Sequence, residues 1–301
     1  VWPGPPALGY SPYHLLVHWP YCLNIPGSGE WRPKNYTKNF KGRVTLTEAL
    51  KDSLNIPAVK VSESVGRETV SAVASQFGIK SDLAAGPALA LGASEGTLLE
   101  MTGAYAGILN GGSSVTPYGL IDLRLLGETE PLMGTGGGIN ERVIQEDAAR
   151  QLVYMMEKVI SEGTGQRAQF GGRQLAGKTG TSQVRNITAA ERARGVTSNA
   201  DLPWERRDHA LFVCFAPFDK PKYAACVLVA HRGRGSTAAA PIARDVILPA
   251  LAGGAPPPAA SPTSARRRPQ THPDQLRALA PGPVPRALGR APARLTPTPP
   301  L

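Results

Sequence analysis

The sequence has few of the features that would place it in a membrane or in a disulfide framework. No stretch approaches the ~20 continuous apolar residues that a transmembrane helix needs, and the first residues lack the layout of a signal peptide. The chain contains only three cysteines, at positions 22, 214 and 226. We expect Cys214 and Cys226 on neighbouring strands, where a bridge is conceivable, but buried free thiols are the better interpretation.

The positive charge is concentrated near the C-terminus. The formal net charge is +10, and residues 255–301 contribute +6 of it through seven arginines and one aspartate, among 13 prolines. Such a composition buries too little apolar surface to fold. We therefore expect a globular domain over residues 1–254 and a disordered tail over residues 255–301, and the basic pI does not predict a nucleic-acid partner.

Local signals predict several helices. Thr45 with Glu48 and Thr97 with Glu100 form capping boxes, which mark helix starts. The first helix is expected to end near Asn55, because Pro57 disfavours the helical conformation of the residue before it. Apolar periodicity predicts further helices over residues 67–77, 98–109, 144–162 and 238–251.

The remaining segments predict strands and loops. Residues 209–216 and 223–230 are apolar runs joined by a Pro-containing turn, which indicates an antiparallel hairpin. Residues 115–135 suggest short strands, and residues 1–44, rich in Pro, Gly and aromatic residues, suggest loops. His14 and His18 have the i, i+4 spacing of a helical metal site, but no acidic or cysteine partner is near, so we predict no metal and no cofactor.

The run Gln174 to Val184, with Lys178-Thr179-Gly180-Thr181 at its centre, carries the most chemistry. On a strand, Lys178 and Gly180 point to one side, and Thr179 and Thr181 point to the other. A ligand along this strand meets the backbone closely at Gly180, which has no side chain. An ammonium group beside hydroxyls suits an anionic, peptide-like substrate.

Ser53-Leu54-Asn55 stands upstream, and together the two motifs resemble those of penicillin-recognising serine enzymes. These enzymes carry S-x-x-K, S-x-N and K-T-G in this order. Residues 45–59, 91–106 and 162–165 also resemble penicillin-binding proteins, and the resemblance extends from about Tyr10 to Gln183. It implies the penicilloyl serine transferase fold, an α/β (α+β) arrangement of an antiparallel sheet flanked by helices, plus a helical lobe.

The S-x-x-K block, which supplies the acylated serine in this family, is missing from the sequence. None of the ten lysines has a serine three residues before it. The segment from Gly9 to Trp31 resembles the family sequence directly after that block, so we expect the chain to begin downstream of the nucleophile and of the family's membrane anchor. Up to K-T-G the sequence resembles class A penicillin-binding proteins, and after it the elongation-type class B proteins.

The resemblance implies a peptidoglycan D,D-transpeptidase domain at the periplasmic face of the bacterial inner membrane. Its partners would be peptidoglycan stem peptides, β-lactams and the cell-wall synthesis machinery. Ser53 would relay a proton, Asn55 would hold the substrate amide, and Lys178 would set the electrostatics of the cleft. Thr179 and Thr181 would bind the terminal carboxylate beside Gly180, and the Thr181 amide would be an oxyanion donor.

Two other functions remain open. A non-catalytic binding or scaffold module would keep the cleft without a nucleophile. A serine β-lactamase of the same fold is disfavoured, because Ser-Leu-Asn stands in place of Ser-Asp-Asn. The structural alternative is that Asn55 merely caps a helix and that Ser53 is solvated. The hypothesis requires Ser53 and Asn55 to face Lys178 across one groove.

Overall fold

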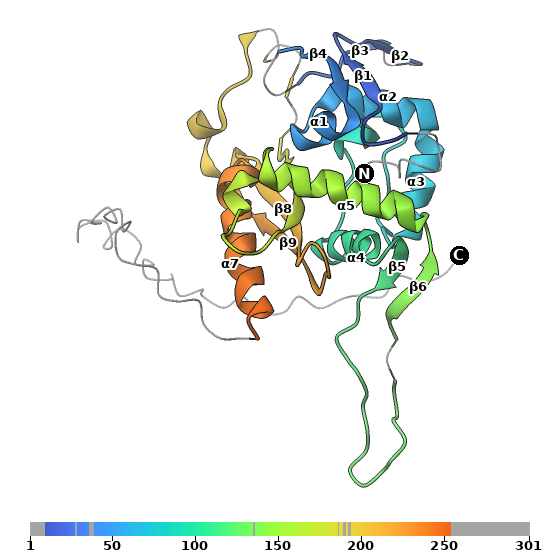
Figure 1. The fold of residues 1–301 in the computed structure, drawn as a ribbon. Coiled ribbons are helices and arrows are strands. Elements are labelled where there is room, and N and C mark those ends of the chain that lie inside the picture. Colours follow the sequence, from blue (N-terminus) through green and yellow to red (C-terminus); the bar gives the residue numbers. More distant parts are fainter. Residues whose placement is uncertain are drawn as a thin grey trace, which may run out of the picture. The chain divides into compact units, whose positions relative to one another are not determined.

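The computed structural model of the protein describes residues 10–253, except for residues 28, 36–38, 135, 186, 189, 190, 192 and 193 (Figure 1). The tail predicted over residues 255–301 lies outside the described residues. Within them, no helix is both long enough and apolar enough to cross a membrane.

A three-stranded antiparallel sheet carries the K-T-G motif. It consists of β7 (Ala176–Ser182), β8 (His209–Ala216) and β9 (Tyr223–Val229), in the order β7-β8-β9. Lys178 is paired with Val213, and Gly180 with Leu211. The predicted hairpin is confirmed, and β7 lies at an edge of this sheet, as a strand that meets a ligand must.

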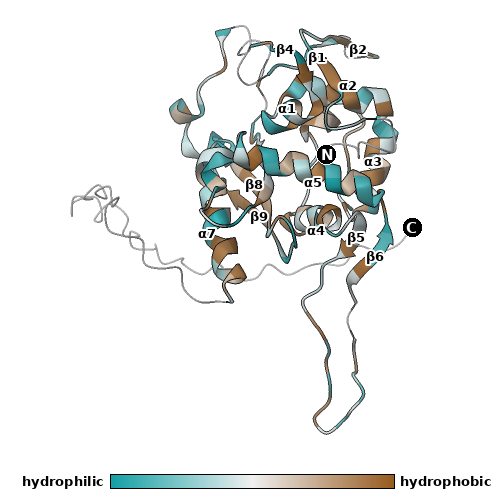
Figure 2. Cartoon of the chain, viewed as in Figure 1, coloured by the Kyte–Doolittle hydropathy of each residue, from teal (hydrophilic) through white to brown (hydrophobic). Residues whose placement is uncertain are grey.

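Helices cover both faces of this sheet. Alternate residues of β8 point to opposite faces: Phe212 and Cys214 pack with α7 (Ala240–Leu251), whereas Phe215 joins the core formed by α4 (Leu98–Leu109) and α5 (Glu146–Ser161). In Figure 2, α5 shows hydrophobic and hydrophilic residues side by side, as expected of a helix with one buried face. The predicted α/β fold with a helix-flanked sheet is confirmed.

The N-terminal part forms the helical lobe. Its helices are α1 (Leu46–Lys51), α2 (Asn55–Val65) and α3 (Arg67–Gln76). Both predicted capping boxes are present, at Thr45 and Thr97. The expectation of loops over residues 1–44 was wrong in part. β1 (Leu15–His18) pairs with β4 (Gly42–Thr45), and β2 (Leu23–Ile25) pairs with β3 (Gly29–Trp31). These strands are too short to show a clear period of two in the sequence.

The helix predicted to run from Thr45 to Asn55 is also shorter than expected. α1 ends at Lys51, where the Leu54 amide donates to the Ala49 carbonyl at 2.9 Å and the Ser53 amide donates to the Leu50 carbonyl at 3.1 Å. This pair of bonds is the Schellman motif, which places its C′ residue in the left-handed region. Ser53 occupies that position with a φ of 55°.

Asn55 begins α2 rather than ending α1. Pro57 does not interrupt this helix because it stands in the first turn, where a backbone N–H has no partner within the helix. The prediction from Pro57 was therefore wrong about Ile56, which is helical. The consequence for the S-x-N motif is that Ser53 and Asn55 flank the junction between two helices.

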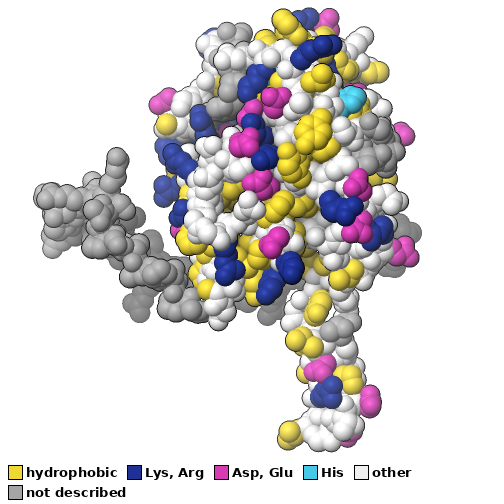
Figure 3. Space-filling view, in the orientation of Figure 1, with side chains coloured by type: hydrophobic (Ala, Val, Ile, Leu, Met, Phe, Trp, Pro, Cys, Tyr) yellow, Lys and Arg dark blue, Asp and Glu magenta, His cyan; other side chains and the backbone are white. Residues whose placement is uncertain are grey.

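A long extension separates β5 (Ser113–Thr116) from β6 (Gly138–Arg142), which pair with each other. In the expected strand region over residues 115–135, residues 115 and 116 belong to β5, and the other described residues form one isolated bridge, between Leu123 and Met133. Figure 3 shows hydrophobic side chains along this extension.

Short helical turns among the described residues are Pro87–Leu91, Gln166–Ala168, Asn199–Asp201, Trp204–Arg206 and Gly235–Ala239.

The three cysteines are free thiols. Cys214 and Cys226 lie on the adjacent strands β8 and β9, as expected, but the residue opposite Cys226 is Val213. Burial raises the pKa of the Cys214 thiol to about 12. The interpretation of these cysteines as free thiols rather than a bridge is confirmed.

The left-handed conformation of Ser53 leads to a stability prediction. A side chain in this region costs about 1–2 kcal/mol, which glycine avoids. Ser53→Gly and Ser53→Ala both remove the hydroxyl, so the difference between their unfolding free energies reports the cost of the left-handed backbone. We expect Ser53→Gly to be more stable than Ser53→Ala by about 1 kcal/mol in urea unfolding. Equal stabilities would mean that position 53 is not left-handed in solution.

Candidate active site

The S-x-N and K-T-G motifs meet through one side-chain contact. The Lys178 ammonium donates to the Ser53 hydroxyl oxygen at 2.7 Å and to the Thr179 carbonyl at 2.9 Å. The two residues are 125 positions apart in the sequence. The meeting between Ser53 and Lys178 that the hypothesis requires is therefore present, with the end of α1 on one side and the edge strand β7 on the other.

Lys178 lies in surroundings that disfavour its charge. It lines an apolar cavity together with core side chains that include Leu50, Phe77, Tyr105 and Met156. Part of the Lys178 surface is open to solvent, yet the packed atoms around it remove enough water to lower its pKa to about 8. A lysine with this pKa is present in both protonation states near neutral pH.

Asn55 follows Ser53 by two residues, but its side chain bonds to the loop before β4 and not to Lys178. The Asn55 side-chain amide donates to the Lys34 carbonyl at 2.7 Å. Asn55 therefore contacts the loop before β4, and a role toward a substrate would require its oxygen or a rotation of the side chain.

Asn35 is a site residue that sequence reasoning missed. α2 has no side-chain cap of its own, and the Asn35 side-chain oxygen accepts from the backbone amides of Asn55 at 3.1 Å and Ile56 at 3.5 Å. The Asn35 nitrogen contacts the ring of His18, which is fully buried. Asn35 thus supplies the hydrogen-bond acceptor that the first amides of a helix need. Because it stands 20 positions upstream of Asn55, no local sequence pattern could have revealed this cap.

His14 and His18 both contact neighbouring side chains of the N-terminal part. The His18 ring nitrogen Nδ1 accepts from the Lys41 amide at 3.1 Å, and burial lowers the pKa of His18. His14 packs edge-on against Tyr10 with ring centroids 4.7 Å apart. Among the described residues, no group of three or more His, Cys, Asp or Glu side chains is placed to hold a metal ion.

The three residues expected to bind substrate lie in sequence along β7. The Thr179 hydroxyl forms a 2.7 Å hydrogen bond with the Thr164 hydroxyl, and the Thr181 side chain is exposed. A Cβ atom at Gly180 would lie 3.2 Å from the Cβ atom of Leu211. Packing against β8 is therefore one reason for glycine at this position, beside the close approach of a ligand.

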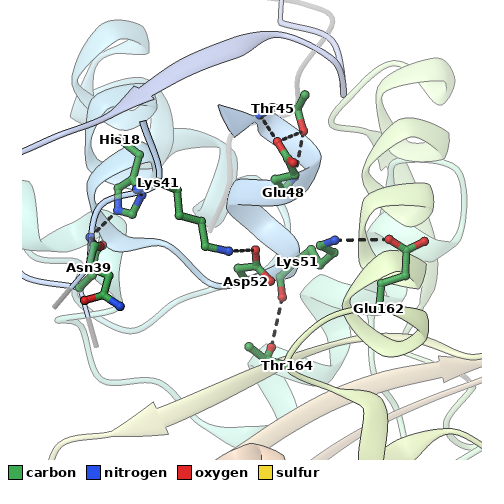
Figure 4. A network of polar contacts seen from close by, with 10 residues as sticks. His18, Asn39, Lys41, Thr45, Glu48, Lys51, Asp52, Glu162 and Thr164 are labelled. Carbon is green, nitrogen blue, oxygen red and sulfur yellow. Dashed lines mark hydrogen bonds and ion pairs between the residues drawn. The ribbon is translucent and has the colours of Figure 1, made fainter. Parts of the chain in front are cut away.

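Thr164 was noted in the sequence only as part of a resembling segment. In the structure it bonds both to Thr179 and to the Lys51 carbonyl, whose contacts Figure 4 draws. The polar groups that join the two motifs therefore include Thr164 as well as Lys178 and Ser53.

The lowered pKa of Lys178 predicts a pH dependence of stability. The pKa of Lys178 is about 8 in the folded protein, against the ordinary value of 10.5 expected in the unfolded chain. Between pH 8 and pH 10.5, the Lys178 amine is therefore protonated more often in the unfolded chain than in the folded protein. Stability from this group therefore rises as the pH increases from about 8 to about 10.5. We expect the unfolding free energy of the wild type minus that of Lys178→Met to increase over this range. A difference that stays constant or falls would contradict the burial of the ammonium.

Comparisons with known proteins agree with this geometry. The family model described as "Penicillin binding protein transpeptidase domain" matches residues 10–248. Penicillin-binding protein 1A of Rickettsia conorii is 33% identical over 178 residues, covering 52% of this chain and 22% of the relative. Penicillin-binding protein 1A of Neisseria cinerea is 30% identical over 243 residues, covering 77% of this chain and 28% of the relative.

A solved structure of a penicillin-binding protein is also similar to this chain. Penicillin-binding protein A of Mycobacterium tuberculosis, in an acyl-enzyme complex with imipenem, matches with a TM-score of 0.63 and 26% identity, over 81% of this chain and 56% of that one. The chain spans about a quarter of the length of the curated relatives that it matches. Because the family model covers most of the described residues, the chain belongs to the penicillin-binding protein transpeptidase family.

Proposed function

We propose that this chain forms the S-x-N and K-T-G side of a D,D-transpeptidase cleft that cross-links peptidoglycan stem peptides through an acyl-serine intermediate. The observation that carries the proposal is the 2.7 Å contact between Lys178 and Ser53. It joins the two motifs beside β7, which lies at an edge of its sheet. The likeness to transpeptidase domains supports the same assignment.

In the proposed reaction, a serine oxygen attacks the carbonyl carbon between two D-alanine residues. The carbon–nitrogen bond breaks, D-alanine leaves with a proton on its amine, and the acyl group then passes from the serine to an acceptor amine. Serine is a weak nucleophile until a base removes its proton. The S-x-x-K block that supplies both groups in the family is missing from these 301 residues.

Ser53 and Lys178 are suited to proton transfer. Because the Lys178 ammonium donates to the Ser53 oxygen, the Ser53 hydroxyl proton is free to point toward a leaving nitrogen. With a pKa of about 8, Lys178 can replace that proton near neutral pH. We assign Ser53 and Lys178 to this relay and Asn55 to the substrate amide.

The strand residues are assigned to substrate binding. Thr179 and Thr181 flank Gly180 on β7, and their hydroxyls suit the terminal carboxylate of the stem peptide. The Thr181 backbone amide is the proposed oxyanion donor from this chain. β-Lactams would bind at the same place, since imipenem forms an acyl-enzyme with penicillin-binding protein A of Mycobacterium tuberculosis.

We also propose that the transpeptidase domain covers residues 1–254 and that residues 255–301 are a tail. The family match, which ends at residue 248, supports this division. The relatives named penicillin-binding protein 1A support a location at the periplasmic face of the inner membrane, with the cell-wall synthesis machinery as partner.

Incubation with a fluorescent penicillin tests the activity. We expect the chain to label several orders of magnitude more slowly than a complete transpeptidase domain, because its S-x-x-K serine is missing. Stable labelling at an ordinary rate would contradict this expectation, and turnover of the drug would favour the β-lactamase alternative.

The DNA upstream of Val1 separates the two explanations of an unlabelled chain. An in-frame S-x-x-K block there would support a catalytic transpeptidase, of which this chain is a part. An upstream sequence without such a block would support the non-catalytic scaffold.

A further inference from the structure

We propose that Thr164 is a positioning residue of the cleft, whose hydroxyl aligns Thr179 on β7 and, through the Lys51 carbonyl, the turn that carries Ser53. The assignment rests on the proposed function, since the groups that Thr164 aligns are those proposed to act on the stem peptide. Thr164 lies in the connection between α5 and β7 and is half-buried.

The connection is packed against the end of α1 without room for a side chain at Gly163. A Cβ atom at Gly163 would lie 2.5 Å from the Lys51 carbonyl oxygen, so only glycine allows this approach. The Gly165 amide donates to the Val159 carbonyl at 2.8 Å, which anchors the segment to α5. Thr164 is thereby held between α1 and β7.

Thr164 makes polar contacts in both directions. Its backbone amide donates to the Lys51 carbonyl at 3.2 Å, and its hydroxyl donates to the same oxygen at 3.4 Å (Figure 4). The same hydroxyl forms the 2.7 Å bond with Thr179. One side chain therefore connects the last residue of α1 with the middle residue of K-T-G.

The hydrogen bond between the Thr164 and Thr179 hydroxyls can run in either of two directions. Each hydroxyl has one proton, and the Lys51 carbonyl can only accept. When Thr164 donates to Lys51, the Thr179 proton points to Thr164. When Thr179 donates to a carboxylate instead, Thr164 can turn its proton to Thr179, and the chain of donors strengthens the outer bond.

Both partners of the Lys178–Ser53 contact are close in sequence to residues that this hydroxyl contacts. Lys178 precedes Thr179 on β7, and Ser53 follows Lys51 by two residues. The ion pair between Lys51 and Glu162, at 3.3 Å, also joins the two segments, but the Glu162 side chain is half exposed. Exposed ion pairs contribute little. The Thr164 backbone amide also donates to the Lys51 carbonyl, but it is the hydroxyl that links this carbonyl to Thr179, so we assign the alignment to the Thr164 hydroxyl.

Three substitutions in the full 301-residue chain test the proposal. Thr164→Val and Thr164→Ala remove the hydroxyl, and Thr164→Ser keeps it. The measurement is the pH titration of the Lys178 side chain by ¹³C NMR, with Lys178→Met to assign its resonance. Desolvation lowers this pKa, so loosening the cleft should raise the midpoint from about 8 toward its ordinary value of 10.5. We expect a rise of about half a pH unit or more in Thr164→Val and Thr164→Ala. Thr164→Ser should titrate as the wild type does.

Thr102→Val is the matched control. The Thr102 hydroxyl donates to the Leu98 carbonyl at 2.7 Å within α4, so its loss removes a comparable bond without touching Lys51, Ser53 or β7. A general loss of stability lowers the melting temperature in both threonine variants, but only a positioning role moves the Lys178 midpoint in Thr164→Val and not in Thr102→Val.

The proposal is overturned if Thr164→Val and Thr164→Ala titrate at the wild-type midpoint, or if Thr102→Val shifts it equally. It is also overturned if neither hydroxyl-free variant folds while Thr164→Ser does, because Thr164 would then serve stability. Penicillin labelling does not enter this measurement. The transpeptidase proposal fails if the DNA upstream of Val1 encodes no S-x-x-K block. A shifted midpoint would leave the assignment of Thr164 intact in that case.

Discussion

The contact between the Lys178 ammonium and the Ser53 hydroxyl is the constraint on which this site depends. It joins an edge strand of the sheet to a turn of the helical lobe across 125 positions of sequence. Each partner is held in an unfavourable state: Lys178 is partly desolvated, and Ser53 is in the left-handed region. Such costs are tolerated where the surrounding structure enforces them, as in functional sites.

The surrounding structure holds both partners through hydrogen bonds of backbone and side-chain groups. The Schellman motif at the end of α1 sets the conformation of Ser53, and the Asn35 side chain caps α2 directly after it. On the other side, pairing with β8 fixes β7, and Thr164 connects the two segments. The side chains that meet in the cleft are therefore placed mainly by hydrogen bonds outside it.

The features that the sequence predicted correctly are those with local signals. The capping boxes at Thr45 and Thr97, the hairpin of β8 and β9 and the strand around Lys178 each depend on neighbouring residues. The break between α1 and α2 was missed because Pro57 was interpreted as a stop rather than as part of a first turn. The cap by Asn35 and the contact of Thr164 with Lys51 could not be predicted, since the partners are 20 and 113 positions apart.

The central claim is that Ser53 and Lys178 meet in the folded chain. The most direct measurement is the nuclear Overhauser effect between the β-methylene protons of Ser53 and the ε-methylene protons of Lys178. We predict a clear cross-peak in the folded protein, which disappears on unfolding in urea. Its absence from a spectrum that shows the β7–β8 pairing intact would contradict the joining of the two motifs, and with it the proposed cleft.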